Sequence, residues 1–540
     1  MSSSSASVVP SASVDAEAAY RALLARDARF DGRLFVGVTS TGVYCRPICR
    51  VRTPSQRNCR FFATPAEAEA AAFRPCLKCR PEIAPGPGFA WSVMDASRTL
   101  ARQAAHALDA AALAAASGDA PSVAAIAATL GVSDRHLRRI FQAEHGVTPL
   151  AWLQTRRLLL AKQLLTDTAL PVATVAGASG FSSVRRFNAA FAAGYRMPPS
   201  RLRRAASDSV ARTRPKAGTP IAAGSEGASV TVRLAFRPPY DADGLPAFIA
   251  PRAVPGVEAV HGGRIVRRTV RGAAIGATVD GWLEAEVDDA RAQVRLRFDA
   301  ALAPWSGALI ATVRRWLDLD ASPDAIGAAL HDIPGGCVRL LGAVDPFELA
   351  VRAVLGQQVT VAAARTLARR LVERFGSPIE TPWPDVSLVF PAPESIAHLP
   401  IDRIAELGII RARAGAIVAI AGAWPEIAPL VARGGDPEAL VARLHALPGI
   451  GPWTAHYIAM RALGWPDAFP ARDIAALNAL RRLDGIATWR DAERRAEAWR
   501  PWRAYALLKL WRSLALDDDA VAEWQAASPA PSTRPSGDDR

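Results

Sequence analysis

Two closely spaced cysteine pairs are the most reactive feature of this sequence. Three residues separate Cys45 from Cys49, two separate Cys76 from Cys79, and 26 residues lie between the pairs. Two short chelating loops of this kind suit a tetrahedral Zn²⁺ site with four thiolate ligands. Free buried or redox thiols are the alternative. Cations beside the cysteines favour the metal site, since they lower thiol pKa values and attract phosphate. These cations are Arg46, Arg50, Arg74, Lys78 and Arg80.

The distribution of the six cysteines also favours a metal over disulfide bonds. Five lie between residues 45 and 79, and the sixth is Cys337. Such clustering in a cytoplasmic chain is typical of metal or thiol chemistry. Cys59 stands outside the paired pattern and is interpreted as an ordinary buried thiol. A single cysteine in the C-terminal half is too few for a four-cysteine iron–sulfur cluster, so none is expected.

The stretches GVYCRPICR and FRPCLKCRPE, with RNCRFFATPAEAEAAAF between them, resemble the N-terminal module of the Ada-type methylphosphotriester repair regulators. The resemblance covers residues 16–84. It implies that Cys45 accepts a methyl group from a DNA phosphotriester and that all four paired cysteines bind one Zn²⁺. Zinc keeps a sulfur ligand as thiolate at neutral pH, and a thiolate is a nucleophile toward a methyl carbon. Methylation would remove a negative charge and so weaken the repulsion of DNA.

Two helix-turn-helix patterns follow in tandem. VAAIAATLGVSDRHLRRIFQ turns at Gly131 and has Ser133 as the N-cap of its second helix, and VATVAGASGFSSVRRFNAAF turns at Gly180 and is capped at Ser182. Each second helix carries basic and amide side chains that suit base edges and phosphates in a major groove. The candidate DNA-binding residues are Arg135, His136, Arg138 and Arg139 in the first copy, and Arg185, Arg186 and Asn188 in the second.

A plain helical bundle with solvated charges is the alternative for either copy alone. Two copies, joined by PLAWLQTRRLLLAKQLL and closed by GYRMPPSRLRR, resemble the AraC-type DNA-binding domain over residues 105–204. The apolar period of three and four predicts helices that break at glycine or proline. Ile140, Phe141, Phe187 and Phe191 are expected in the core of this bundle.

A glycine-rich turn in the C-terminal half is a candidate DNA contact. LHALPGIGPWTAHYIAM places Gly449 and Gly451 between two helices, where the backbone N–H groups of a tight turn can face a phosphate. Such a turn is often only a connection, so the signal is moderate by itself. Asp473 follows in FPARDIAAL, and the residues alone leave it either a catalytic carboxylate or a structural helix cap.

Five segments in order, RLAFRPPYD, DPFELAVRAVLGQQVT, LPGIGPWTAHYIAMRAL, DAFPARDIAAL and AWRPWRAYALLKLW, resemble the AlkA-type 3-methyladenine DNA glycosylases. The resemblance implies that Asp473 is the catalytic carboxylate, that Trp453, Tyr457 and Trp511 line the base pocket, and that Gln358 wedges into the base stack. An alkylated purine is cationic and its glycosidic bond is weak, so aromatic faces can bind it while a carboxylate stabilises the oxocarbenium-like sugar.

Three departures from related proteins narrow this interpretation. Trp453 stands where bifunctional helix-hairpin-helix glycosylases place a Schiff-base lysine, which implies a monofunctional enzyme without strand cleavage. A polar Gln358 is a weaker apolar insert than an aliphatic residue, which puts the efficiency of flipping in doubt. No Pro-Cys-His-Arg sequence occurs, so the O6-methylguanine transferase domain of longer Ada proteins is absent.

The elements that must position these residues form several units, because 540 residues exceed one core. Val230, Val232, Leu234 and Phe236 share one face of a strand, as do Val294, Leu296 and Phe298. We predict a multidomain, mainly α protein with a small zinc domain, a double helix-turn-helix bundle, a small α+β sheet domain and a helix-hairpin-helix domain. The predicted bounds are 1–15 disordered, 16–84 zinc domain, 105–204 helix-turn-helix domain, 205–228 linker, 229–315 sheet domain, 316–523 glycosylase domain and 524–540 disordered tail.

Charge is concentrated in the N-terminal half. Residues 1–204 hold 26 Lys and Arg against 13 Asp and Glu, whereas residues 205–540 hold 39 against 38. A basic half suits a polyanion, although the excess of arginine is also explained by a composition bias. No run of about 18 uncharged apolar residues occurs and no signal-peptide pattern opens the chain, so we expect a soluble cytoplasmic protein without a membrane partner.

The sequence therefore predicts a phosphotriester sensor, promoter-binding regulator and base-excision glycosylase in one chain. Double-stranded DNA, alkylated and promoter, is the expected partner, with RNA polymerase as a further one. The rival is a pure damage-responsive transcription regulator whose C-terminal domain binds damaged DNA without catalysis; the presence of Asp473 favours the enzyme. The Ala-, Gly-, Ser- and Pro-rich stretch 205–228 predicts that the two halves are energetically separable.

Overall fold

The computed structural model describes residues 14–86, 96–113, 122–204, 229–432, 435–470 and 472–517. The predicted linker 205–228, the predicted tail 524–540 and nearly all of the predicted disordered start 1–15 lie outside these residues. Asp15 is described, and its carboxylate caps the first helix by accepting the Glu17 N–H at 3.0 Å. Within the described residues no single helix is long and apolar enough to cross a membrane, and one bent helix pair, Arg411–Gly422 with Trp424–Val431, passes by length and composition.

The N-terminal unit is a small four-stranded sheet in the order β3-β1-β2-β4. The strands β2 and β4 are parallel neighbours, with Tyr44 paired to Pro75. Cys45 ends β2 and Cys76 directly follows β4, so this pairing brings the two cysteine loops together. The elements are α1 (Ala16–Leu24), β1 (Phe35–Val38), β2 (Val43–Cys45), β3 (Cys59–Phe62), α2 (Pro65–Ala70) and β4 (Arg74–Pro75).

An all-helical unit carries both helix-turn-helix patterns. The predicted cap Ser133 is confirmed, but the second copy is capped by Ser183 and not by Ser182, because the Ser183 hydroxyl accepts the Arg186 N–H at 3.2 Å. The core residues expected for this unit, Ile140, Phe141, Phe187 and Phe191, are buried. A helix that begins at Ala96 precedes the predicted start of this unit. The helices are α3 (Ala96–Leu113), α4 (Val123–Thr129), α5 (Asp134–His145), α6 (Pro149–Asp167), α7 (Val172–Ala178) and α8 (Val184–Tyr195).

The next unit is a five-stranded antiparallel sheet in the order β5-β9-β8-β7-β6, with β5 at one edge. Alternate residues of β5 and β9 are buried, as the period of two predicts. One face packs against helices α10 and α11, which close its core. The elements are β5 (Ser229–Ala235), α10 (Gly244–Ile249), β6 (Glu258–His261), β7 (Ile265–Val270), β8 (Gly281–Asp288), β9 (Gln293–Asp299) and α11 (Ser306–Trp316).

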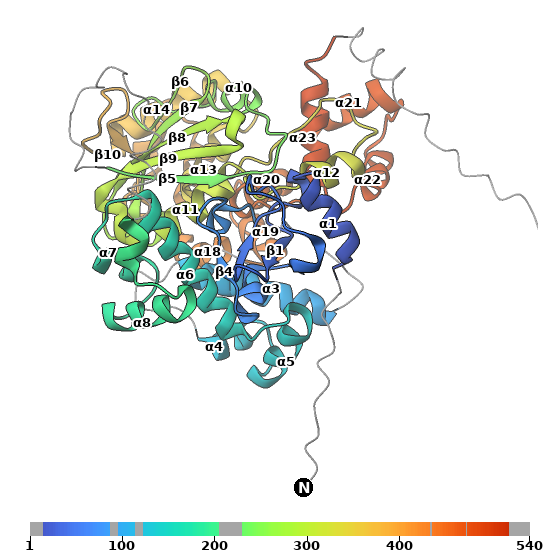
Figure 1. Cartoon of the computed structure of the whole chain (residues 1–540). Helices are drawn as coiled ribbons and strands as arrows, with labels where there is room; N and C mark the ends of the chain where they lie inside the picture. The colour runs from blue at the N-terminus through green and yellow to red at the C-terminus, as the bar shows by residue number, and fades with distance from the viewer. Residues whose placement is uncertain are drawn as a thin grey trace, which may run out of the picture.

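The C-terminal unit is helical and has two apolar cores, one around α13, α17 and α20 and one around α21 and α23. Figure 1 shows α21, α22 and α23 side by side at one end of the molecule. The elements are α12 (Pro323–Ala329), α13 (Pro346–Leu355), α14 (Val361–Phe375), β10 (Ser377–Pro378), β11 (Leu388–Val389), α15 (Pro393–Ala397), α16 (Ile401–Ala405), α17 (Arg411–Gly422), α18 (Trp424–Val431), α19 (Pro437–His445), α20 (Pro452–Leu463), α21 (Ile474–Asp484), α22 (Trp489–Glu497) and α23 (Arg503–Ser513). The predicted mainly α multidomain architecture is confirmed.

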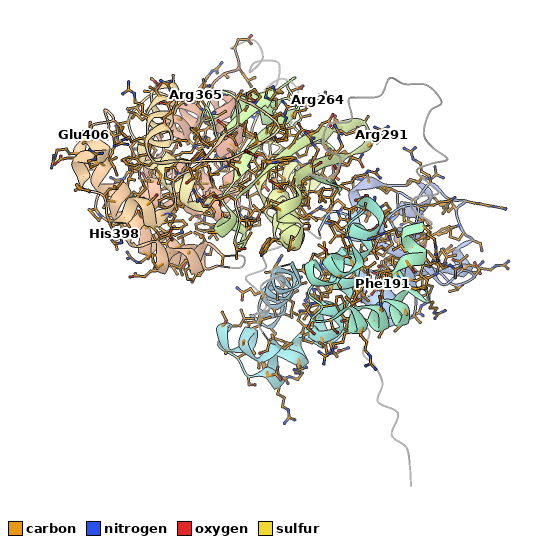
Figure 2. The ribbon with its side chains drawn as sticks, turned by 90° about the vertical axis from the view of Figure 1, so that its left-hand side faces the viewer. Phe191, Arg264, Arg291, Arg365, His398 and Glu406 are labelled. Carbon is orange, nitrogen blue, oxygen red and sulfur yellow. The ribbon has the colours of Figure 1, made fainter. Side chains whose placement is uncertain are left out.

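The two halves of the chain are packed together, and the prediction that they are energetically separable stays a prediction. One apolar cluster contains Phe187 and Phe191 of α8 together with Val232 and Phe298 of the sheet unit. The long helix α6 also covers the β5 edge, which would otherwise expose unpaired backbone groups. Figure 1 shows α6 and α7 against this edge. Figure 2 shows the labelled Phe191 in the helix-turn-helix unit.

Side chains of α6 bond the backbone of β5 directly. The Gln163 amide donates to the Arg233 carbonyl oxygen at 2.9 Å, and the Arg233 N–H donates to the Asp167 carboxylate at 3.2 Å. Helix α6 also bonds the N-terminal unit, called the cysteine unit below. The buried Lys162 ammonium pairs with Glu82 and donates to the Cys76 carbonyl oxygen at 3.3 Å. Helix α6 therefore lies between the cysteine unit and the sheet unit and binds both.

Candidate metal centre and glycosylase site

The four paired cysteines form one cluster. Their Sγ atoms all lie within 4.8 Å of one another, and Cys45, Cys49 and Cys76 are buried. Backbone N–H groups already point at this cluster: Arg46 N donates to Cys79 Sγ at 3.3 Å and Lys78 N to Cys76 Sγ at 3.4 Å. A compact set of four sulfur donors with supporting N–H groups fits a tetrahedral Zn²⁺.

The thiols of this cluster also share protons strongly. Hydrogen bonding with Cys45 lowers the pKa of the Cys76 thiol, and hydrogen bonding with Cys49 raises the pKa of the Cys45 thiol. Four neighbouring thiolates repel one another, so they require a cation at their centre to be ionised together. A bound Zn²⁺ supplies that charge and leaves the ligands as thiolates.

The cations beside the cysteines have two different roles. The Arg46 guanidinium is buried and donates to Asp31 at 2.7 Å, and the buried Arg80 pairs with Glu82 and Asp167. These two arginines hold the fold together, so the prediction that they attract phosphate is wrong. Arg50 and Lys78 are exposed and keep that role open. Cys59 is only half-buried, so the prediction of a buried thiol is also wrong.

Asp473 lies at the meeting point of three helices. It is the N-cap of α21, where one carboxylate oxygen, Oδ1, accepts the Ala476 N–H at 2.7 Å. The Trp453 indole on α20 donates to the other oxygen, Oδ2, at 2.7 Å, and the Trp511 indole on α23 donates to Oδ1 at 3.1 Å. The cap interpretation is therefore confirmed, and the catalytic interpretation stays a prediction. In the described part of the chain no arginine or lysine forms an ion pair with this buried carboxylate.

The predicted pocket aromatics gather beside this carboxylate. The Trp453 and Tyr457 rings are stacked, with centroids 5.1 Å apart and planes 9° apart, because the two residues lie one helical turn apart on α20. Trp453, Tyr457 and Trp511 are all half-buried, so each keeps an open ring surface. Flat aromatic faces next to a negative charge can receive a cationic base.

The glycine-rich turn has the predicted form. Residues Leu447 to Gly451 join α19 to α20, and Gly449 has a φ of +78°. A Cβ at Gly449 would lie 2.9 Å from the Ala416 Cβ, so only glycine fits there without a shift. Gly451 is the N-cap of α20 and offers no side chain to the first-turn N–H groups. The helix dipole and these donors suit a phosphate.

Four family models match the chain in this order. The metal binding domain of Ada matches residues 18–82, and a helix-turn-helix domain matches 126–205. The AlkA N-terminal domain matches 231–337, and the HhH-GPD superfamily base excision DNA repair protein model matches 351–504. A probable bifunctional transcriptional activator/DNA repair enzyme AlkA of Mycobacterium tuberculosis (strain H37Rv) is 37% identical over 520 residues, which cover 94% of this chain and 98% of that protein.

The chain belongs to this bifunctional activator and repair family. Each half also matches a separate protein of Escherichia coli (strain K12). DNA-3-methyladenine glycosylase 2 is 34% identical over 282 residues, 52% of this chain and 95% of that protein. The bifunctional transcriptional activator/DNA repair enzyme Ada is 35% identical over 139 residues, 26% of this chain and 35% of that protein. The chain thus joins a methyl-acceptor zinc domain with one Zn²⁺ site, an AraC-type regulator domain and a 3-methyladenine glycosylase domain.

The bifunctional protein exposes the predicted DNA-binding side chains of both regulator helices. Arg135, Arg138 and Arg139 are exposed on α5, and His136 is half-buried. Within this helix, Arg138 pairs with Asp134 at 2.8 Å and Arg139 contacts the His136 ring nitrogen Nδ1 at 3.1 Å. Exposed on α8 are Arg185, Arg186 and Asn188.

A set of side chains behind Tyr457 was not predicted from the sequence of this bifunctional protein. The buried Arg461 guanidinium donates to the Tyr457 hydroxyl at 3.0 Å and lies 4.6 Å from the Phe248 ring centroid. Arg252 lies over the same ring at 4.0 Å. Phe248 belongs to α10 of the sheet unit, so this unit borders the aromatic site. The spacing of four between Tyr457 and Arg461 was a signal for that contact.

A groove of ≈ 990 Å³ lies beside the hairpin and is distinct from the Asp473 site. It is lined by Val441, His445, His456, Trp465 and Arg500 among others, and by neither Asp473 nor the tryptophans that bond it. The indole N–H donors and the stacked aromatic rings instead converge on Asp473.

Proposed function

We propose that Asp473 is the catalytic carboxylate and that Trp453, Tyr457 and Trp511 form the base pocket. The convergence of two indole N–H groups on the Asp473 carboxylate carries this proposal. Neutral donors fix the carboxylate without cancelling its charge, so that charge can act on the positive sugar that forms in the transition state.

The reaction is a hydrolysis at the deoxyribose C1′ carbon. The bond from C1′ to the alkylated base breaks, and the base leaves with the bonding electrons, which neutralise its positive charge. Water then bonds to C1′ and gives up a proton, with Asp473 guiding its approach. Gln358 fills the space left in the stack, and the Gly449 and Gly451 turn binds a phosphate of the same duplex.

The enzyme is proposed to be monofunctional. A covalent route to strand cleavage needs an amine that forms a Schiff base with the opened sugar. Both side chains that hydrogen-bond Asp473 in the described residues are tryptophans, and an indole N–H is not a nucleophile. The product is therefore an intact abasic site.

Cys45 is proposed as the methyl acceptor of the zinc domain. Its sulfur attacks the methyl carbon of a phosphotriester, the C–S bond forms, and the C–O bond breaks to release a phosphodiester anion. The zinc-binding residues would be Cys45, Cys49, Cys76 and Cys79. Their thiolates bring a double negative charge to the centre with Zn²⁺, and methylation removes one of these charges, which favours approach to DNA.

Promoter binding is proposed for α5 and α8. The exposed side chains of both helices suit phosphates and base edges. The protein would act on DNA in the cytoplasm and contact RNA polymerase as an activator.

The full chain tests both chemical proposals in one experiment. Duplex DNA treated with a methylating agent should lose 3-methyladenine, and borohydride should trap no protein–DNA adduct. Intact mass and peptide mapping of the same sample should show one methyl group on Cys45. Promoter binding without release of base would instead identify a pure regulator, and a methyl group on another cysteine would refute the acceptor assignment.

A further inference from the structure

One side chain joins the loop between α13 and α14 to the glycine-rich hairpin. The Gln357 amide nitrogen Nε2 donates to the Gly449 carbonyl oxygen at 3.1 Å and to the Thr454 hydroxyl at 3.1 Å. The Gln357 backbone carbonyl in turn accepts a hydrogen bond from the Arg413 guanidinium on α17. Both amide hydrogens are thus used, and three elements that are far apart in sequence meet at this residue.

The next residue, Gln358, is exposed and strained. Its φ of +53° lies in the left-handed region, which is unfavourable for a residue other than glycine. Such a conformation persists only where neighbouring contacts fix the chain. Gly356 ends α13 and Thr360 caps α14, so the loop is short. The bonds made by Gln357 are the restraint nearest to the strained residue.

The glycine-rich hairpin also packs against α17. The close approach of Gly449 to Ala416 packs the turn against α17, the helix that also carries Arg413. Thr454 is buried in the first turn of α20, whose N-terminus is the proposed phosphate site. The Gln357 side chain therefore bonds the hairpin directly, and the Gln357 backbone directly precedes the strained Gln358.

We infer that Gln357 is a positioning residue for base flipping, which couples phosphate binding at the hairpin to insertion of Gln358. The inference rests on the proposed wedge role of Gln358. Flipping costs a few kcal/mol, and two contacts offset this cost together only if their geometry is fixed before the base leaves the stack. A polar wedge gains little from apolar contact, so its placement carries the effect.

Single-turnover excision on two substrates tests this role in the full chain. One duplex carries 3-methyladenine opposite thymine, and the other carries it opposite an abasic site, where no base pair must open. Gln357→Ala removes the amide, and Gln357→Glu keeps its size but loses its donors at neutral pH. Gln142→Ala is the matched control, because that amide donates to the Gly146 carbonyl oxygen at 2.8 Å in the regulator unit.

Both Gln357 variants should lose about tenfold in rate on the paired lesion and less than about threefold on the unpaired one, because only the first must open a base pair. Fluorescence of 2-aminopurine beside the lesion should report less flipping, and Gln142→Ala should match the wild type. Thr454→Val and Gln357→Ala both remove the hydrogen bond between these two side chains. The rate loss of the double variant should therefore be smaller than the two single losses combined. Equal losses on both substrates, or none on the paired lesion, overturn the inference. A wild-type chain that excises neither lesion refutes the proposed glycosylase site instead.

Discussion

The cysteine centre and the Asp473 site differ in the length of chain that builds them. All four cysteines lie between residues 45 and 79, and the parallel pair β2 and β4 joins their two loops. Asp473 instead depends on Trp453 from α20 and Trp511 from α23, with Phe248 of the sheet unit behind the pocket. A local pattern encodes the first site, and the tertiary fold encodes the second.

The two sites also differ in how their negative charge is balanced. The cysteine centre brings four sulfur ligands together, so it requires a metal cation. The neighbouring Arg46 and Arg80 do not balance this charge, because both form buried ion pairs with carboxylates. Among the described residues, the hydrogen-bond partners of Asp473 are all neutral N–H donors. The comparison teaches that a metal balances the charge of the first site, whereas the proposed role of Asp473 leaves the charge of the second site to a cationic substrate.

Removal of zinc should produce the largest difference between the two sites. Structural Zn²⁺ binds with an apparent free energy of about 10 to 16 kcal/mol in zinc-finger peptides, and the sheet around Phe35, Tyr44 and Phe62 has a small core of its own. Chelation should abolish methyl transfer and leave base excision within about threefold, since Asp473 lies in another core. Zinc content, hydrogen exchange of the N-terminal unit and excision rate on one sample measure this. A parallel loss of excision would show that the packed halves also share their chemistry.

Asp473→Asn should have the next largest effect. Asparagine is also a good N-cap, so α21 should keep its start while the charge that stabilises the sugar is lost. Removal of one preorganised electrostatic group costs on the order of 10² in rate or more, and operator binding should be unchanged. Single-turnover kinetics and a melting curve measure the two effects.

Asp345→Asn is the matched control for that variant. Asp345 is also a buried N-cap aspartate, since it caps α13 and accepts the Phe347 N–H at 2.8 Å. It has no indole donors in the described structure, so its substitution should leave excision near the wild-type rate. Near wild-type excision by a well-folded Asp473→Asn variant would mean that Asp473 is only a cap.

Trp453→Phe and Trp511→Phe should each lower the excision rate by a smaller amount. Each change keeps an aromatic face but removes one N–H donor to Asp473, and a hydrogen bond to a charged group contributes about 1.5 to 3 kcal/mol. A rate loss of about tenfold is expected if half or more of that free energy is lost in the transition state. Trp465→Phe, a half-buried tryptophan in the groove beside the hairpin, is the control. An unchanged rate in both variants would limit the tryptophans to stacking.

The sequence predicted these two sites to different depths for physical reasons. Cysteine spacing is a local property, so the ligand set could be read directly. The contact of Phe248 with Arg461 joins two units and leaves no local pattern, so it could not be predicted from the sequence. The indole hydrogen bonds of the cap residue Asp473 also depend on helices that only tertiary packing brings together.

Secondary structure was predicted well where a period was long, and less well at boundaries and interfaces. The alternation of Val230, Val232 and Leu234 gave β5, whereas two adjacent serines left the cap of α8 misplaced by one residue. The packing of α6 against β5 was missed because its bonds use the backbone of Arg233, which any residue supplies. The composition of residues 205–228 predicts a linker, but it carries no information about the contacts between the units that the linker joins.

Asp345→Asn should show the smallest effect, in the pH dependence of stability. Burial, with the neighbouring Glu348 charge, raises the pKa of Asp345 to about 6 from its ordinary value of 3.8. In the folded chain this carboxyl therefore keeps its proton up to about pH 6, whereas in the unfolded chain it loses it near pH 4. The wild type should lose the stability due to this group as the pH rises from about 4 to 6. Asparagine does not titrate, so the variant should gain on the order of 1 to 2 kcal/mol relative to the wild type between pH 4 and pH 8. Unfolding midpoints of both proteins across this range measure the difference, and a constant difference would show that Asp345 is ionised in the fold, like a carboxylate held only by hydrogen bonds.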